Sequence, residues 1–253
     1  MADLRIENMS VSASGAMLVK PLSFCARPSE MIAIIGPNGA GKTSLLRSII
    51  GLGEQVTGGA FIDGQAVSVM KPHHRAQLIS YLPQSLPLAW PIRVTDAVAL
   101  GRYPHGADSE GDAAVERALS DCDLLALAQR STDSLSGGEL TRVHVARTFA
   151  CAAPIILVDE PIAALDPSHA LAVMQLLRRH ADDGGTVVVV MHDLGLAARF
   201  ANRILGMRDG CLLFDEAPKA AITPENIAAL FDVKATIDDT SGWPQPTVVA
   251  ALT

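Results

Sequence analysis

Aromatic residues are scarce in this chain: they make up 4% of its 253 residues, and no tyrosine or tryptophan precedes Tyr81. Long apolar runs are also missing, because the longest have the length of a strand, far short of the about 20 residues that span a membrane. The first residues show no apolar segment of a signal peptide. These absences argue against an integral membrane protein and predict a soluble, intracellular chain.

Paired cysteines and an excess of basic charge are missing as well. The four cysteines are widely scattered, with no C-x-x-C pair, which predicts small buried thiols rather than a zinc site or a disulfide framework. The net charge of −7 argues against binding to nucleic acid through its phosphates. The 49% of hydrophobic residues suffice for a large core, so the length suits one large domain or a domain with an inserted lobe.

The chain is organised around a glycine-rich stretch that matches the pattern G-x-x-x-x-G-K-[ST]. An apolar run over residues 31–35 precedes it and is typical of a buried parallel strand, and residues 45–50 predict a helix that stops at Gly51. Backbone N–H groups and a positive helix end would meet there and bind a chain of phosphates. The alternative, a chance glycine-rich turn, does not explain these flanks. The predicted phosphate-binding residues are Gly36, Pro37, Asn38, Gly39, Ala40, Gly41, Lys42, Thr43 and Ser44.

Two further apolar runs end in polar side chains. Residues 154–158 lead into Asp159 and Glu160, and residues 186–191 lead into His192. Both runs follow helical stretches, so they fit parallel strands, whose carboxyl ends collect ligands at one edge of a sheet. Asp159 is suited to hold the Mg²⁺ shell and Glu160 to orient and deprotonate the attacking water. The purely structural alternative is that both carboxylates are ordinary charges that complement a helix N-terminus.

His192 and Gln84 complete the predicted catalytic group. An imidazole that ends a third core strand can hydrogen-bond the γ-phosphate, although a lone histidine is more often an ordinary loop residue. Gln84 follows a short predicted strand over 79–82, and its amide could touch Mg²⁺ or water, although glutamines are common in loops. The predicted catalytic residues are Glu160, His192, Gln84 and Lys42, and the predicted Mg²⁺ ligands are Thr43, Gln84 and Asp159.

A second anion site is predicted at the segment Leu135-Ser136-Gly137-Gly138-Glu139. Ser136 and Glu139 have the spacing of a capping box, so the segment would start a helix that continues to about Ala150. A good helix start is the purely structural alternative. The functional hypothesis is that two glycines expose N–H groups beside a serine hydroxyl at a positive helix end, which suits an anion.

The remaining pattern divides the chain into a core, an inserted lobe and a tail. Alternating apolar residues over 3–35 predict an antiparallel edge, and Thr57-Gly58-Gly59 and Asp63-Gly64 bracket a further hairpin strand. Helices are predicted over 71–78 and 112–129. The predicted divisions are an α/β core over 1–85 and 153–222, a helical subdomain over 86–152 and a C-terminal tail over 223–253.

In order and spacing, these motifs resemble those of the ATP-binding cassette (ABC) transporter ATPases, from about residue 4 to about residue 214. The resemblance implies an α/β fold: a P-loop NTPase core with an antiparallel β edge and an inserted α-helical subdomain. Within that family, Leu88-Ala89-Trp90-Pro91 and residues 98–105 resemble the importers of iron chelates, haem and vitamin B12. The matching parts are the glycine loop, Gln84, Leu135 to Glu139, Ile155 to Glu160, Leu165-Asp166 and His192.

The resemblance also implies a head-to-tail homodimer that binds ATP and Mg²⁺ at its seam. Each ATP would lie between the glycine loop of one copy and Ser136, Gly137 and Gly138 of the other, with Asp166 near the seam. The helical subdomain and the region around Gln84 would grip transmembrane permease subunits at the cytoplasmic face of the membrane. An extracytoplasmic substrate-binding protein would be an indirect partner, and nucleic acid is not an expected partner.

The sequence departs from the family pattern in four places, two single residues and two pairs. Ala13 stands where the family usually carries an aromatic residue that stacks on adenine, so recognition of the base is expected to be weaker or borrowed. Ser29 replaces a usual turn glycine, Ile162-Ala163 replaces a common Thr-Ser pair, and Leu140-Thr141 replaces a common polar pair. None of these positions touches the phosphate chemistry.

The sequence thus predicts an ATP-hydrolysing, energy-coupling subunit of an importer for an iron–siderophore complex, haem or cobalamin. The alternatives are an ABC ATPase for another cargo and a soluble ABC ATPase, which would usually carry two cassettes or a long coiled-coil insertion. A small-molecule kinase would have no use for Leu135 to Glu139. A catalytically silent binding module would be expected to lack Glu160 or His192.

Overall fold

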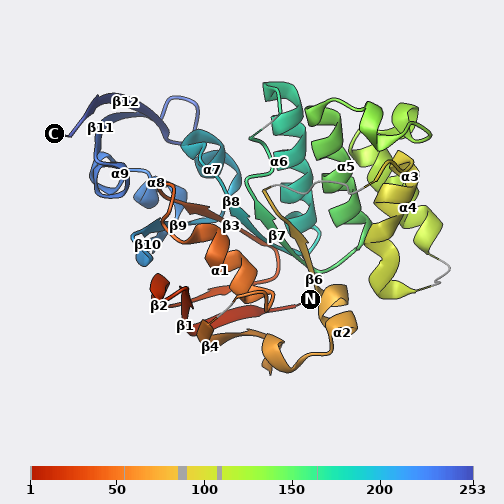
Figure 1. Ribbon diagram of the computed structural model, residues 1–253. Helices are drawn as coiled ribbons and strands as arrows, with labels where there is room; N and C mark the ends of the chain where they lie inside the picture. The colour runs from red at the N-terminus through yellow and green to blue at the C-terminus, as the bar shows by residue number, and fades with distance from the viewer. Residues whose placement is uncertain (1, 54, 85–89, 107–109, 164, 253) are drawn as a thin grey trace.

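The computed structural model describes every residue except 1, 54, 85–89, 107–109, 164 and 253. Among the described residues, the central sheet has the strand order β10-β9-β3-β8-β7-β6, in which β10 is antiparallel to β9 and the other strands are parallel. The neighbours β3, β8, β7 and β6 therefore bring their carboxyl ends to one edge (Figure 1). The strands are β3 (Glu30–Ile35), β6 (Ile79–Leu82), β7 (Ile155–Asp159), β8 (Thr186–Val190), β9 (Arg203–Arg208) and β10 (Cys211–Glu216).

The inner strands are buried on both faces, because alternate side chains enter two different cores. In β3, Ile32 and Ile34 face the first core, whereas Met31 and Ala33 face the second. The helix α1 (Lys42–Ile49) and a second, antiparallel sheet cover the first core (Figure 1). In order across that sheet, the strands are β2 (Ala16–Ala26), β1 (Leu4–Ala13), β4 (Gln55–Ile62) and β5 (Gln65–Ala66).

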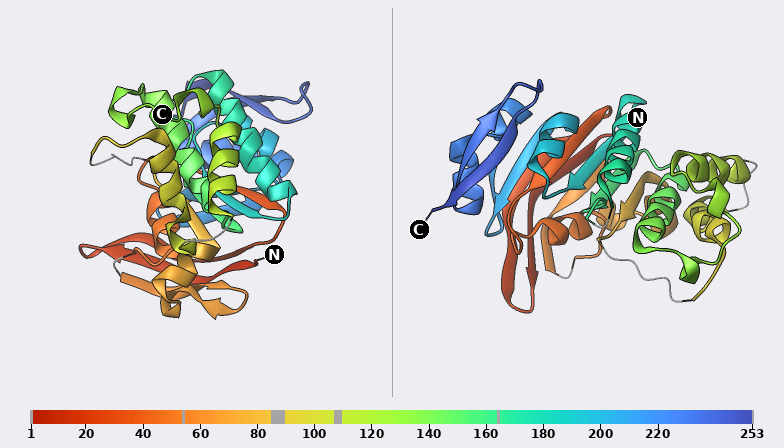
Figure 2. Two further views of the ribbon diagram at one scale, coloured as in Figure 1. Left: turned by 90° about the vertical axis from the view of Figure 1, so that its right-hand side faces the viewer. Right: turned by 90° about the horizontal axis from the view of Figure 1, so that it is seen from above.

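Helices cover the second core. Three of them, α3 to α5, lie together at one end of the molecule, and a C-terminal hairpin lies at the opposite end (Figure 2). The hairpin consists of β11 (Val233–Asp238) and β12 (Gln245–Ala251). The helices are α3 (Val94–Ala99), α4 (Gly111–Asp121), α5 (Gly137–Ala150), α6 (Pro167–Asp182), α7 (Leu194–Phe200), α8 (Pro218–Ala221) and α9 (Pro224–Phe231), with α2 (Pro72–Leu78) beside β6.

The α/β fold predicted from the sequence is confirmed, with corrections to three segments. The strands within residues 3–26 belong to a separate sheet rather than to an edge of the central one. The glycines of Thr57-Gly58-Gly59 lie inside β4, so the hairpin turn is at Asp63-Gly64. The helix predicted over 112–129 ends at Asp121, because Asp123 adopts a left-handed conformation with φ of +53°.

The tail packs on the core, because the Arg199 guanidinium of α7 lies 4.8 Å from the centroid of the Trp243 ring. The turn residue Ser29 adopts a φ of +64°, a conformation that glycine adopts without strain. The predicted boundary at 85/86 and the pair Leu88-Ala89 lie outside the described residues. None of the described helices is long and apolar enough to cross a membrane.

Candidate functional site

The glycine loop lies between β3 and α1. At two of its positions, the backbone of a neighbouring strand leaves no room for a Cβ. A Cβ on Gly36 would lie 1.9 Å from the carbonyl oxygen of Met207, and a Cβ on Gly41 would lie 2.4 Å from that of Leu18. Gly41 is the N-cap of α1 and supplies no capping side chain, so the first N–H groups of the helix stay available. They face a cavity of about 440 Å³ that the loop residues 38–44 line together with Leu18, Gln84 and Glu160. N–H groups at a helix N-terminus beside such a cavity are suited to an anion.

Lys42, the first residue of α1, is buried, and its side chain reaches back to the start of the glycine loop. Its side chain is 5% exposed, and Nζ donates hydrogen bonds of 2.8 Å to the carbonyl oxygens of both Gly36 and Pro37. Burial lowers the pKa of Lys42, although the carboxylates of Glu160 and Asp159 oppose that shift. An ammonium group has three donors, so one remains for a phosphate oxygen. Gly36 and Pro37 therefore hold the lysine, whereas the residues after them line the cavity.

Asp159 ends β7 next to the loop and is 1% exposed. Neither carboxylate oxygen has a hydrogen-bond partner of good geometry among the described residues, and burial raises the pKa of this group. The Thr43 hydroxyl lies beside the carboxylate, as does Tyr81, whose own pKa burial raises to about 12. A buried, unpartnered carboxylate beside a hydroxyl fits a hard cation such as Mg²⁺. Tyr81 is a member of this site that the sequence pattern did not indicate.

Glu160 is the centre of a hydrogen-bonded group drawn from three strand ends. Gln84, after β6, donates from Nε2 to Oε2 of Glu160 over 2.7 Å, and Nε2 of His192, after β8, lies 2.6 Å from Oε1. The backbone of Glu160 adopts a φ of +51° and its N–H donates to the carbonyl oxygen of Val190. Such a left-handed conformation is costly for a residue with a Cβ and is kept because the surroundings impose it. Both carboxylate oxygens are thereby fixed at the mouth of the cavity.

The segment from Ser136 to Glu139 starts α5, and the capping box predicted there is present. The Ser136 hydroxyl accepts from the N–H of Glu139, whose carboxylate accepts from the N–H of Ser136. Asp166 likewise caps α6 through the N–H groups of Ser168 and His169. None of these residues lines the phosphate cavity of its own chain.

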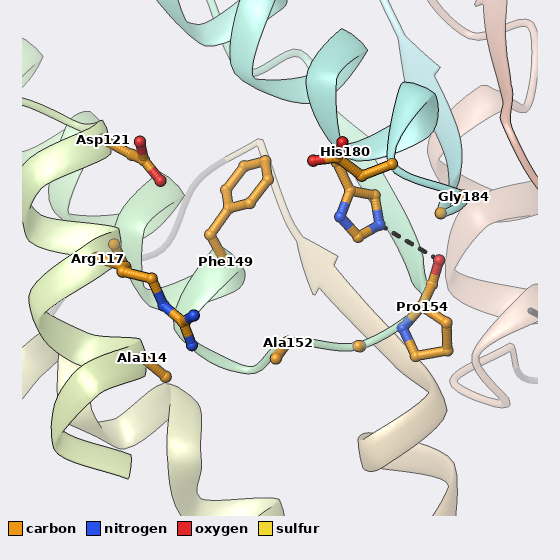
Figure 3. A pocket seen from close by; sticks show the side chains of 12 residues that line it. Ala114, Arg117, Asp121, Phe149, Ala152, Pro154, His180 and Gly184 are labelled. Atoms are coloured by element: carbon orange, nitrogen blue, oxygen red, sulfur yellow. Dashed lines mark hydrogen bonds between the residues drawn. The ribbon is translucent and has the colours of Figure 1, made fainter. Parts of the chain in front are cut away.

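A second cavity, of about 570 Å³, lies away from the glycine loop (Figure 3). It is bounded by α4, by the connection from α5 to β7 and by the end of α6, and none of the predicted site residues lines it. His180 and Phe149 meet edge to face in its wall, with ring centroids 5.9 Å apart. Burial lowers the pKa of His180, whose Nε2 lies 3.3 Å from the carbonyl oxygen of Pro154.

Comparisons with known proteins identify the family of the chain. The "ABC transporter" family model matches residues 19–163. The chain is 36% identical over 253 residues to the hemin import ATP-binding protein HmuV of Pseudomonas aeruginosa, covering 98% of this chain and 99% of that protein. It is 34% identical to the cobalamin import ATP-binding protein BtuD of Halobacterium salinarum, over 92% of this chain and 60% of that one.

Two solved structures are similar over most of the chain. One is a dimeric ATP-binding cassette in a post-hydrolysis state bound to ADP and Pi, with a TM-score of 0.75 and 29% identity, covering 85% of this chain and 98% of that one. The other is a proposed metal-chelate type ABC transporter in an inward-facing conformation, with a TM-score of 0.82 and 25% identity, covering 99% and 98%. The resemblance inferred from the sequence motifs is confirmed: the chain belongs to the ABC transporter family, as one of its ATPases.

Proposed function

We propose that this ATPase is the energy-coupling subunit of an importer, and that Glu160 activates the water that attacks the γ-phosphate. The observation that carries the proposal is the clamp on Glu160. Its carboxylate is held at 2.7 Å and 2.6 Å by Gln84 and His192, at the opening of the cavity that the glycine loop lines. A fixed carboxylate at that place can accept the proton of an attacking water.

The glycine loop would position the triphosphate for that attack. Residues 38–44 surround the cavity, and Lys42 would give its remaining donor to a β- or γ-phosphate oxygen. Thr43 and Asp159 would hold Mg²⁺, with Gln84 at its edge; the ion would neutralise charge on the phosphates. His192 would contact the γ-phosphate from the opposite side of Glu160.

A second copy of the chain would complete the site. Ser136, Gly137, Gly138 and Asp166 do not reach the phosphate cavity of their own chain, although the N-terminus of α5 is exposed and carries a positive helix end. In a head-to-tail pair, that helix end would cap the triphosphate of the partner. ATP bound across the seam would then favour the closed pair, and hydrolysis would release it.

The permease would dock beside the region of Gln84. A groove of about 230 Å³ runs between α5 and β6, the strand that precedes Gln84, and Leu100 and Tyr103 line it with exposed fractions of 52% and 82%. Exposed apolar side chains at a groove mark a protein contact. We assign residues 86–152 to a helical subdomain that moves with the permease, 1–85 and 153–222 to the ATP-binding core, and 223–253 to the tail. This contact would hold the chain at the cytoplasmic face of the membrane.

The cargo we propose is an iron–siderophore complex, haem or cobalamin. Support comes from the names of the relatives, which are import proteins for hemin and cobalamin, and from the similar structure of a proposed metal-chelate type transporter. An extracytoplasmic binding protein would deliver that cargo to the permease.

The test is ATP hydrolysis by the purified chain, together with recovery of a multi-span membrane protein from detergent extracts. We expect phosphate release that depends on Mg²⁺ and a permease that co-purifies in stoichiometric amount. Hydrolysis without a membrane partner would instead favour a soluble ABC ATPase. Absence of hydrolysis would contradict the role of Glu160.

A further inference from the structure

Tyr81 lies in β6, at the edge of the central sheet, beside the strand that ends in Asp159. The two strands are parallel, and their register places Tyr81 opposite Leu157. Side chains alternate between the two faces of a strand, so Leu157 and Asp159 share one face. That face belongs to the first core, on which the ring of Tyr81 also packs. The tyrosine therefore stands one diagonal step from the Asp159 carboxylate, a separation that an aromatic side chain can span.

We propose that Tyr81 is a positioning residue of the metal site: its hydroxyl donates a hydrogen bond to the Asp159 carboxylate and orients that carboxylate toward Mg²⁺ beside the glycine loop. The inference rests on the proposed function, because it needs the metal site of Thr43 and Asp159. It adds the side chain that sets the direction of the acidic metal ligand.

The buried carboxylate of Asp159 needs a donor from the protein. It is 1% exposed, and neither of its oxygens has a hydrogen-bond partner of good geometry among the described residues. Burying a carboxylate is unfavourable unless a donor or a cation compensates its charge. Two hydroxyls lie beside it, those of Thr43 and Tyr81. Because the proposed site assigns the Thr43 oxygen to the cation, the Tyr81 hydroxyl is the donor that remains for the carboxylate.

The surroundings of the phenol favour donation toward Asp159. A phenol is protonated at neutral pH, because its ordinary pKa is about 10, and an ionised carboxylate can only accept a hydrogen bond. The charge of the Arg47 guanidinium also acts on the phenol. Arg47 follows Thr43 by one turn of α1, so the two side chains lie on the same side of that helix. A positive charge at that place attracts the phenol oxygen and leaves its O–H for the carboxylate.

This position predicts an effect on the metal and little effect on the nucleotide itself. A hydrogen-bond partner behind a metal ligand fixes the orientation of that ligand, and its removal typically lowers metal affinity about 10–100-fold. Such hydrogen bonds often reach good geometry only when the ligand is bound. Tyr81 does not line the phosphate cavity, so its hydroxyl is not expected to contact the phosphates. The nucleotide affinity that depends on Mg²⁺ should therefore fall without Tyr81, whereas the affinity without metal should stay.

The first experiment measures the dissociation constant of the non-hydrolysable ATP analogue AMP-PNP in Mg²⁺ and in EDTA, for the wild-type chain and for Tyr81→Phe. The variant keeps the ring that packs on the first core, so its melting temperature should stay within a few degrees. We expect its affinity in Mg²⁺ to fall about tenfold and its affinity in EDTA to stay within about twofold. Tyr103→Phe is the matched control, because Tyr103 is 82% exposed and does not line the phosphate cavity.

The second experiment measures phosphate release from ATP over a range of Mg²⁺ concentrations, which separates orientation of the metal ligand from the chemical step. In Tyr81→Phe we expect the Mg²⁺ concentration at half-maximal turnover to rise about tenfold, while kcat at saturating Mg²⁺ stays within about threefold. A tyrosine that only packs would leave the Mg²⁺ midpoint where it is in the wild type. A lower kcat with an unchanged midpoint would place Tyr81 in the chemical step and overturn its role at the metal ligand.

The two readouts distinguish failure of this inference from failure of the proposed function. If AMP-PNP binds the wild-type chain more tightly in Mg²⁺ than in EDTA and Tyr81→Phe keeps the whole difference, this inference alone is overturned. An equal fall of affinity in Mg²⁺ and in EDTA, or an equal effect of Tyr103→Phe, would overturn it as well. A wild-type chain whose affinity is the same in Mg²⁺ and in EDTA would contradict the proposed metal site and this inference with it.

Discussion

Replacing Glu160 with glutamine tests the catalytic group with little change in shape. The variant keeps the same Cβ, so the backbone φ of +51° is no more strained than before. The amide can accept a hydrogen bond on one side and donate on the other, so the Gln84 amide and the other tautomer of His192 can both satisfy it. We therefore expect the free energy of unfolding to change by less than about 1 kcal/mol.

Turnover should fall far more than stability. An amide cannot take the proton of the attacking water, and a positioned general base contributes about 10²–10⁴ in rate. That range corresponds to about 3–5 kcal/mol of transition-state stabilisation. The glycine loop and Lys42 do not depend on Glu160 for their own contacts, because Lys42 is held by the carbonyl oxygens of Gly36 and Pro37. Binding of ATP should therefore persist within about threefold.

The assay combines phosphate release under saturating MgATP with calorimetric titration of ATP. Glu116→Gln, on an exposed position of α4, is the control for the loss of one carboxylate and should behave as the wild type. Wild-type turnover in Glu160→Gln would remove Glu160 from the mechanism. Loss of ATP binding in that variant would show that Glu160 organises the site rather than the chemistry.

Three further changes address the loop and the second cavity. Lys42→Met should abolish measurable ATP binding in titrations and leave the melting temperature within a few degrees, because burial of the ammonium already disfavours its charge; unchanged affinity would contradict the phosphate contact. Gly36→Ala should lower the free energy of unfolding in denaturant by about 2–4 kcal/mol, because its Cβ would lie 1.9 Å from the Met207 carbonyl oxygen. Gly39→Ala, which has open space around the added Cβ, should lower it by about 1 kcal/mol, and equal losses in the two variants would refute the packing argument. Burial lowers the pKa of His180 in the folded chain. As the pH falls below about 6.5, this histidine therefore becomes protonated in the unfolded chain before it does so in the folded chain, and the free energy of unfolding decreases. The melting temperature of His180→Gln should fall less between pH 7 and pH 5 than that of the wild type, and parallel curves would contradict this.

The sequence pattern predicts the central strands and the glycine loop because strands that are buried on both faces consist of continuous apolar runs. The apolar runs before Gly36, Asp159 and His192 are β3, β7 and β8, and β6 lies before Gln84. These strands are neighbours in the sheet, so residues far apart in the chain meet at one edge. The expected convergence of Gln84, Glu160 and His192 follows from that order.

Three other features cannot be predicted from the apolar pattern of the sequence. Alternation in residues 3–26 is the same whether a strand joins the central sheet or a separate one, so the second sheet was not predicted. Apolar periodicity continues past Asp121, so it does not predict the left-handed conformation of Asp123 that ends the helix. Tyr81 reaches Asp159 only because β6 lies next to β7.

In the proposed cycle, nucleotide draws two copies of the chain together across the glycine loop and the N-terminus of α5. Sedimentation equilibrium of Glu160→Gln measures this most directly, with Gly137→Asp added as the contrast. An aspartate in the first turn of α5 complements the helix dipole, and Gly137 has open space around it, so the fold should be kept while the charge repels the phosphates of a partner. We predict a monomer without nucleotide, a dimer with MgATP, and a monomer with MgATP once Gly137→Asp is present. A chain that stays monomeric with MgATP although hydrolysis is blocked would show that ATP does not close two copies around the glycine loop.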